Sequence, residues 1–139
     1  MGIFILKEIK TENRDRVFKL YVPYFGDLTV HYYEYDEDLI EGQKSKKRYI
    51  GDTINGTLNV NMVSVHKIDQ SKLFIEQPFE MSPFIKMTGI IDKKIDDYSY
   101  RMKTSIPQNI LTVEFESKVY YVSGEKIYFE GILNLEDSS

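Results

Sequence analysis

The chain has 139 residues, enough for one domain with a substantial core. It contains no cysteine, which excludes disulfides and thiolate metal sites, and its net charge of −4 argues against a protein that mainly grips phosphates. Alanine is absent while isoleucine, valine, threonine, tyrosine and phenylalanine are plentiful, and this balance favours strands over helices.

No apolar run is long enough to cross a membrane, and the N-terminus lacks the layout of a signal peptide, so we expect a cytoplasmic protein.

The first third of the chain predicts three strands and one polar loop. The strands are expected over residues 2–9, 16–22 and 28–35, with a turn at 24–27. Residues 34–48 run acidic and then basic, which is typical of a surface loop.

The start of this loop is the first candidate binding surface. Its carboxylates follow two tyrosines, and such an acidic, tyrosine-rich patch could cover a basic site on a protein partner. A solvated loop is the simpler interpretation, and the spacing of a calcium-binding EF-hand is absent. The candidate partner-binding residues are Tyr33, Tyr35, Asp36, Glu37 and Asp38.

The middle of the chain carries turn signals. Asn55-Gly56 is the preferred pair for a tight hairpin turn, although one continuous bent strand is the alternative. The apolar parity changes between Met62 and Val63, which predicts a β-bulge. A short strand is expected at 73–76, followed by a loop that contains Pro78 and Pro83.

The last third has the most regular alternation. Strands are expected over 84–91 and 97–104, followed by one long hairpin over 110–135 with its loop at 123–125. In this register Tyr120 and Tyr128 form an outward pair, and Ser117 meets Gly131 where a bend or close approach is expected. Residues 136–139 are expected to form a disordered tail.

Two segments of the chain have similar sequences. Residues 51–60 contain two glycines followed by an alternating Leu-Asn-Val, and residues 124–135 repeat this order with two extra residues before the inner glycine. Turn-and-strand chemistry alone can produce such a match, so a true repeat and a coincidence both stay open.

Residues 84–135 contain Met87-Thr88-Gly89-Ile90-Ile91, alternation at 98–103 and 112–115, and the glycine-punctuated run 124–133. Together these features carry a resemblance to an OB-fold barrel. It implies a surface for single-stranded nucleic acid, with tyrosines that stack on bases and cations that hold phosphates. The candidate residues for that surface are Lys93, Lys94, Tyr98, Tyr100, Arg101, Tyr120 and Tyr128. An ordinary polar face with packing tyrosines is the alternative interpretation.

No catalytic motif is present, and the two histidines, His31 and His66, lack the spacing of metal ligands. We therefore predict no enzyme activity, no metal and no cofactor. The sequence predicts one all-β domain over 1–135 with little or no helix, built as an antiparallel barrel, OB-like or otherwise, or as a sandwich of roughly nine or ten strands.

Three functions stay open. The first is a protein-binding module of the inhibitor, immunity or assembly type, and the second is an OB-like protein that binds single-stranded nucleic acid. The third is a lipocalin-like carrier of a small apolar ligand, which the lack of tryptophan disfavours. The sequence does not indicate an oligomeric state.

Overall fold

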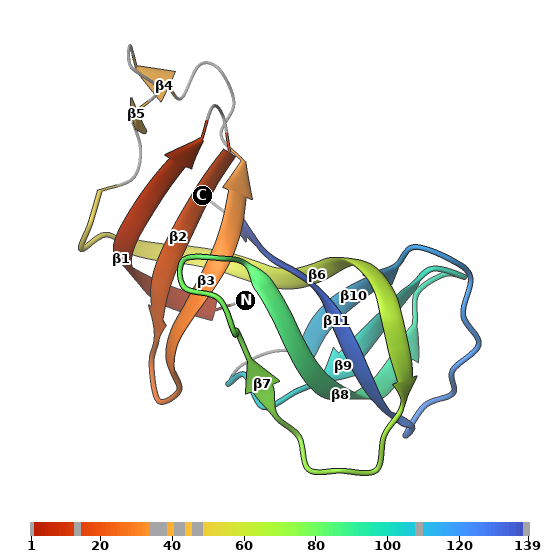
Figure 1. Cartoon of the computed structure of the whole chain (residues 1–139). Helices are drawn as coiled ribbons and strands as arrows, with labels where there is room; N and C mark the ends of the chain where they lie inside the picture. Colours follow the sequence, from red (N-terminus) through yellow and green to blue (C-terminus); the bar gives the residue numbers. More distant parts are fainter. Residues whose placement is uncertain are drawn as a thin grey trace.

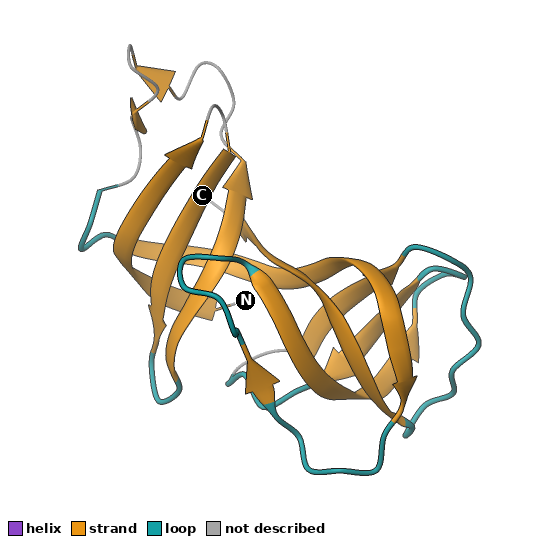
Figure 2. Cartoon of the chain, viewed as in Figure 1, coloured by secondary structure: helices purple, strands orange, loops and turns teal. Residues whose placement is uncertain are grey.

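The computed structural model describes residues 2–12, 15–33, 39–40, 44–45, 49–107 and 110–137. Within these residues the chain is all β, with strands and loops and no helix, as Figure 2 shows, so the predicted fold class is confirmed. Nine strands form one large sheet: β1 (Gly2–Glu12), β2 (Asp15–Val22), β3 (Gly26–Tyr33), β6 (Thr53–Ile68), β7 (Ile75–Glu76), β8 (Phe84–Lys94), β9 (Ser99–Lys103), β10 (Ile110–Phe115) and β11 (Lys126–Asp137). A separate pair is formed by β4 (Leu39–Ile40) and β5 (Lys44–Ser45).

Two antiparallel meanders make up most of the sheet. β1, β2 and β3 follow one another in space as in sequence, and so do β8, β9 and β10. Alternation of apolar and polar residues explains this, since every second side chain of β2 is buried, including Phe18 and Leu20. The predicted strands at 2–9, 16–22, 84–91 and 97–104 are confirmed with small changes at their ends.

The two long strands β6 and β11 join the meanders. They run antiparallel from the pair Ile127–Ile68 to the pair Asp137–Gly56. The start of β6 also pairs with β1 and the start of β11 with β8, while β10 runs parallel to β6 and β3 parallel to β11. Each meander is thereby closed into a ring of hydrogen-bonded strands that shares β6 and β11 with the other ring (Figure 1).

The predicted hairpin over 110–135 is wrong. β10 ends at Phe115 and pairs with β9 and β6, while β11 pairs with β6 and β8, so β6 lies between the two strands that were expected to pair. Phe115, Val119 and Phe129 are buried as the alternation predicts, but Ser117, expected to meet Gly131 inside, is exposed after the end of β10. Alternation determines which face of a strand is buried, but it does not determine which strand lies beside it.

The hairpin at Asn55-Gly56 is also wrong, because β6 continues through both residues as one strand. The predicted bulge is confirmed: Met62 has φ 58°, and the register with β11 shifts between Glu130 and Ile132. The tail expected over 136–139 is wrong for Glu136 and Asp137, which belong to β11, and residues 138–139 lie outside the described part.

The core fills the interior of both rings. In the N-terminal ring it contains Phe4, Leu6, Phe18, Leu20, Val30 and Ile54, and in the C-terminal ring Met87, Tyr100, Met102, Val113, Phe115 and Phe129. Burial of apolar area on this scale is the main contribution that stabilises a domain of this size. None of the described residues forms a helix long and apolar enough to span a membrane.

Candidate functional site

Two loops lie side by side at the free end of the C-terminal ring, at the right of Figure 1. One joins β8 to β9 over residues 95–98, and the other joins β10 to β11 over residues 116–125. The Val119 amide donates to the Asp97 carbonyl at 3.2 Å, and the Gly124 amide donates to the Ile91 carbonyl at 2.8 Å. These bonds hold the longer loop against the β8–β9 hairpin, so the two loops form one surface.

The shorter loop owes its shape to Asp96. Its carboxylate Oδ1 accepts hydrogen bonds from the amides of Tyr98 and Ser99, both at 2.8 Å. Aspartate favours turns because its side chain can bond the backbone two or three residues further on. The turn ends where the ladder of β9 begins, at Ser99, so the Tyr98 side chain stays outside the ring.

Four large hydrophobic side chains on these loops are exposed, and we call them the tip surface. Ile95 is 50% exposed, Tyr98 43%, Tyr120 80% and Val122 66%. None of them belongs to the buried core, to which the longer loop contributes Val119. Apolar side chains gathered at one place on a surface commonly mark an interaction site.

Ion pairs lie beside the exposed hydrophobic residues of the tip surface. The Asp97 carboxylate forms an ion pair with Lys94 Nζ at 3.1 Å and a longer one with Lys118 Nζ at 3.9 Å. The hydrogen bond to Lys94 lowers the pKa of Asp97, and the same bond raises the pKa of Lys94, so both groups are charged at neutral pH. Asp97 offsets one of these two positive charges, which weakens but does not remove their attraction for a phosphate.

A shallow depression of about 640 Å³ adjoins Tyr98. Three carboxylate residues line it, together with the aromatic rings and the serine of the neighbouring strands. Its lining residues are Asp96, Tyr98, Ser99, Glu114, Phe115 and Glu116. An acidic depression beside an apolar surface fits a basic side chain on a partner and disfavours an anion.

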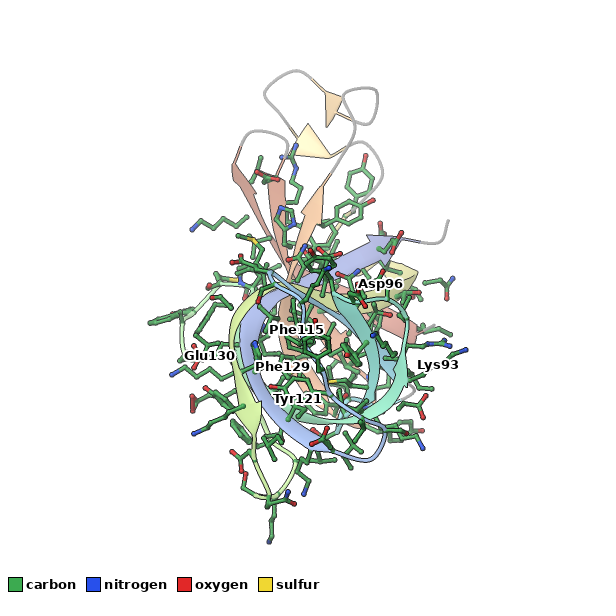
Figure 3. All side chains as sticks on the ribbon, turned by 90° about the vertical axis from the view of Figure 1, so that its right-hand side faces the viewer. Lys93, Asp96, Phe115, Tyr121, Phe129 and Glu130 are labelled. Atoms are coloured by element: carbon green, nitrogen blue, oxygen red, sulfur yellow. The ribbon has the colours of Figure 1, made fainter. Side chains whose placement is uncertain are left out.

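The structure brings together several residues of the predicted nucleic-acid surface. Lys93 and Arg101 are cross-strand partners on β8 and β9, and Lys94, Tyr98 and Tyr120 lie at the tip surface. Figure 3 shows Lys93 directed away from the ring, next to the loop that carries Asp96.

Two tyrosines of that prediction do not belong to the surface. Tyr100 is fully buried, and its hydroxyl donates to the Val119 carbonyl at 2.8 Å, so its ring cannot stack on a base. Tyr128 stacks on Phe74 with ring centroids 6.0 Å apart, and Lys67 lies 5.7 Å from the same ring. The predicted pairing of Tyr128 with Tyr120 is therefore wrong.

The contacts of the Tyr128 side chain indicate a structural role. Its hydroxyl donates to the Glu130 carboxylate, and burial followed by this bond raises the pKa of Tyr128 to about 12. A tyrosine held in this way stabilises the sheet between β7, β8 and β11 instead of presenting a free ring.

A cluster that the sequence did not predict fills the mouth of the C-terminal ring. Figure 3 shows Phe115, Tyr121 and Phe129 inside the ring. His66 Nδ1 and the Tyr121 hydroxyl oxygen share a hydrogen bond at 2.6 Å, and the His66 ring meets Phe115 edge-on with ring centroids 5.0 Å apart. Burial lowers the pKa of His66 and raises that of Tyr121, so both side chains are neutral at pH 7. The two residues are 55 positions apart, and no local pattern could pair them.

The acidic candidate surface lies mostly beyond what the structure describes. Tyr33 ends β3 opposite Asp15, whereas Tyr35, Asp36, Glu37 and Asp38 lie outside the described residues. Among the described residues, no three histidine, aspartate or glutamate side chains converge in a way that could hold a metal ion.

The chain was compared with known proteins on three levels. No protein-family model, no curated protein and no solved structure matches it.

Proposed function

We propose that this protein is a non-enzymatic binding module that docks onto another protein through the tip surface. The observation that carries the proposal is the set of four exposed hydrophobic side chains, Ile95, Tyr98, Tyr120 and Val122, on two loops fixed to each other by backbone hydrogen bonds. The partner that fits is a protein that presents apolar side chains with a lysine or arginine beside them, because an acidic depression adjoins Tyr98.

The composition of the tip surface supports a protein partner. Tyrosine is enriched at the centres of protein interfaces, where a large ring gains contact area at a small cost in conformational entropy. The ion pairs of Lys94 and Lys118 with Asp97 lie beside the apolar residues, as polar rims do in such interfaces.

Single-stranded nucleic acid is the second candidate. The cross-strand pair Lys93–Arg101 favours it, since two cations on one sheet face could follow a phosphate backbone near the exposed Tyr120 ring. The closed five-strand ring of β6, β8, β9, β10 and β11 supports an OB-like interpretation of this half. Asp97 and the acidic depression speak against it, because they would repel phosphates.

The carrier function has less support. The interiors of both rings are filled by core side chains such as Phe18 and Phe129, which leaves the space that a lipocalin-like ligand would need occupied by protein.

Affinity capture from the source cell with three immobilised proteins tests the proposal. The double variant Ile95→Ser/Tyr120→Ser removes half of the tip surface, and Tyr24→Ser is the matched control, since Tyr24 is 98% exposed on the β2–β3 turn of the other ring. We expect one protein to be retained by the wild type and the control and lost by the double variant. Equal retention by all three proteins would contradict docking at the tip surface.

A fluorescence anisotropy titration tests the second candidate. Labelled single-stranded DNA and RNA are titrated at low and at near-physiological salt with the wild type and with Lys93→Ala/Arg101→Ala. We expect no binding at near-physiological salt. Binding that persists there and is lost in the double variant would replace the protein-docking proposal with nucleic-acid binding.

The acidic segment is a further proposed contact for a basic partner. Neutralising Asp36, Glu37 and Asp38 to their amides should weaken capture of the same partner and remove part of its salt dependence. Unchanged capture by this triple variant would exclude the segment from the interface.

A further inference from the structure

The turn that leads into β6 has a defined set of hydrogen bonds. The Gly51 amide donates to the Leu6 carbonyl at 2.7 Å, and the Leu6 amide donates to the Asp52 carbonyl at 2.9 Å. Within the turn, the Asp52 amide donates to the Tyr49 carbonyl at 3.0 Å, and the Tyr49 amide donates to the Asp52 carboxylate at 2.9 Å. Gly51 has φ +97°, a conformation that favours glycine.

The turn that leads into β11 has the same bonds. The Gly124 amide donates to the Ile91 carbonyl at 2.8 Å, and the Ile91 amide donates to the Glu125 carbonyl at 2.8 Å. The Glu125 amide donates to the Val122 carbonyl at 3.1 Å, and the Val122 amide donates to the Glu125 carboxylate at 2.6 Å. Gly124 has φ +93°. All four contacts of the first turn therefore recur in the second.

The meanders on which these turns dock also agree in register. β1 shifts its register against β2 between Leu6 and Glu8, whose partners are Leu20 and Lys19. β8 shifts its register against β9 between Ile91 and Lys93, whose partners are Met102 and Arg101. The bulge thus falls at the residue that receives the glycine turn in both halves.

The third strand of each meander carries the same three residues. Leu28-Thr29-Val30 in β3 and Leu111-Thr112-Val113 in β10 are identical tripeptides. Their cross-strand partners correspond as well, since Phe18 and Leu20 face Val30 and Leu28, and Tyr100 and Met102 face Val113 and Leu111. All eight side chains in these pairs are buried.

The inner glycines of the long strands lie in matching surroundings. A Cβ atom on Gly56 would come within 2.7 Å of the Glu136 carbonyl oxygen, and one on Gly131 within 2.6 Å of the Asn61 carbonyl oxygen. Both carbonyls belong to the opposite long strand and lie 75 positions apart in sequence, as do the two glycines. The closest side-chain atoms, from Leu135 and Val60, also lie 75 positions apart.

Each half completes the ring of the other. The third strand of the first half runs parallel to the long strand of the second, through the pair His31–Asn134. The third strand of the second half runs parallel to the long strand of the first, through the pair Thr112–Asn59. Two similar units that exchange one strand would show this reciprocal pairing.

We propose that the chain is an internal duplication, in which two equivalent units of a three-strand meander, a glycine turn and a long strand exchange their long strands. Within the chain, each unit therefore binds the other unit. The loop 116–125, which carries Tyr120, is then the counterpart of residues 34–52, so the two segments that carry the proposed partner contacts are the same connection of the repeat.

An exchange of turns in the full chain tests the equivalence. One variant, Tyr49→Val/Ile50→Ser/Asp52→Glu, gives the first turn the sequence of the second, and Val122→Tyr/Ser123→Ile/Glu125→Asp makes the reverse change. We expect the Tm of both variants to stay within about 4 °C of the wild type, whereas Gly51→Val and Gly124→Val each lower it by a similar, larger amount. A loss above about 10 °C in either exchanged chain would overturn the equivalence of the turns.

Cleavage of the folded chain tests the exchange of strands without changing any residue of the sheet. A protease site is placed between Ser71 and Lys72, both exposed in the connection between the halves, where we expect the folded protein to be cut. We expect the two fragments to elute as one particle, because separation requires the whole β6–β11 ladder to open. Fragments that separate under native conditions would overturn the exchanged arrangement.

Discussion

Asn59 and Asn134 face each other across the two long strands, and the Asn134 amide donates to Asn59 Oδ1 at 3.2 Å. The same side-chain nitrogen, Asn134 Nδ2, donates to the Ile132 carbonyl at 3.0 Å, while Asn134 Oδ1 lies 3.2 Å from His31 Nδ1. Asn134 thus links β3, β11 and β6 through its side chain at the place where the two rings meet.

Replacement of Asn134 should weaken this junction. Asn134→Ala loses all three contacts, and we expect the free energy of unfolding to fall by about 1–2 kcal/mol, as for a few partly buried hydrogen bonds. Asn59→Ala, which loses one of them, should cost less. Urea unfolding of both variants measures the difference, and an Asn134→Ala protein as stable as the wild type would contradict a structural role for this contact.

Gly131 should tolerate no side chain. A Cβ atom there would meet the Asn61 carbonyl at 2.6 Å and Val60 Cγ1 at 2.7 Å, and a backbone oxygen in the middle of a ladder cannot move aside. We expect Gly131→Ala to cost about 1–3 kcal/mol or more, as overpacked cores do. Gly89→Ala is the control, because a Cβ atom there would meet no backbone atom and its nearest neighbours, Met102 Cβ and Sδ, lie 3.2 Å away. Similar urea midpoints for the two variants would refute this account of the Gly131 packing.

The His66–Tyr121 pair predicts a pH dependence of stability. Burial lowers the pKa of His66 in the folded state below the 6.5 of an unfolded chain, so below about pH 6.5 the unfolded state binds more protons. The stabilising contribution is therefore full above pH 6.5 and is lost as the pH falls through the folded pKa. Carboxylates also titrate in acid, so the comparison that matters is between the wild type and His66→Asn, whose amide oxygen can still accept from Tyr121. Urea unfolding at pH 7 and pH 5.5 should show a smaller loss for the variant, and identical losses would exclude His66 as the titrating group.

The tip surface should contribute to binding and not to folding. Because Tyr120 and Ile95 are exposed and lie outside the core, we expect Ile95→Ser/Tyr120→Ser to change the free energy of unfolding by no more than about 1 kcal/mol. Thermal unfolding checks this before any capture experiment is interpreted. A loss above about 2 kcal/mol would mean that these residues support the loops, and the capture result would then lose its meaning.

The sequence predicted faces of strands better than their neighbours. Phe115 and Phe129 alternate with polar residues, and the alternation placed both side chains correctly in the core. The insertion of β6 between β10 and β11 could not be predicted, because it depends on contacts between residues more than 50 positions apart. The bulge at Met62 could be predicted, since a bulge inverts the local parity of the strand itself.

The candidate site was predicted in part for the same reason. Tyr98 and Tyr100 share a parity, yet Tyr98 is exposed and Tyr100 is buried. The turn held by Asp96 accounts for this difference in exposure, because the strand ladder begins only at Ser99, after Tyr98. The exposure of Ile95 and Val122 depends on how the two loops dock on each other, and alternation within a strand carries no information on that docking.

Hydrogen–deuterium exchange on the captured complex, compared with the free protein, tests the central claim most directly. Docking at the tip surface predicts slower exchange in residues 92–98 and 116–125 of the complex, with the outer face of β1 around Ile3 and Ile5 unchanged. Protection confined to that β1 face would contradict the account, and so would any pattern of protection that leaves residues 92–98 and 116–125 unchanged.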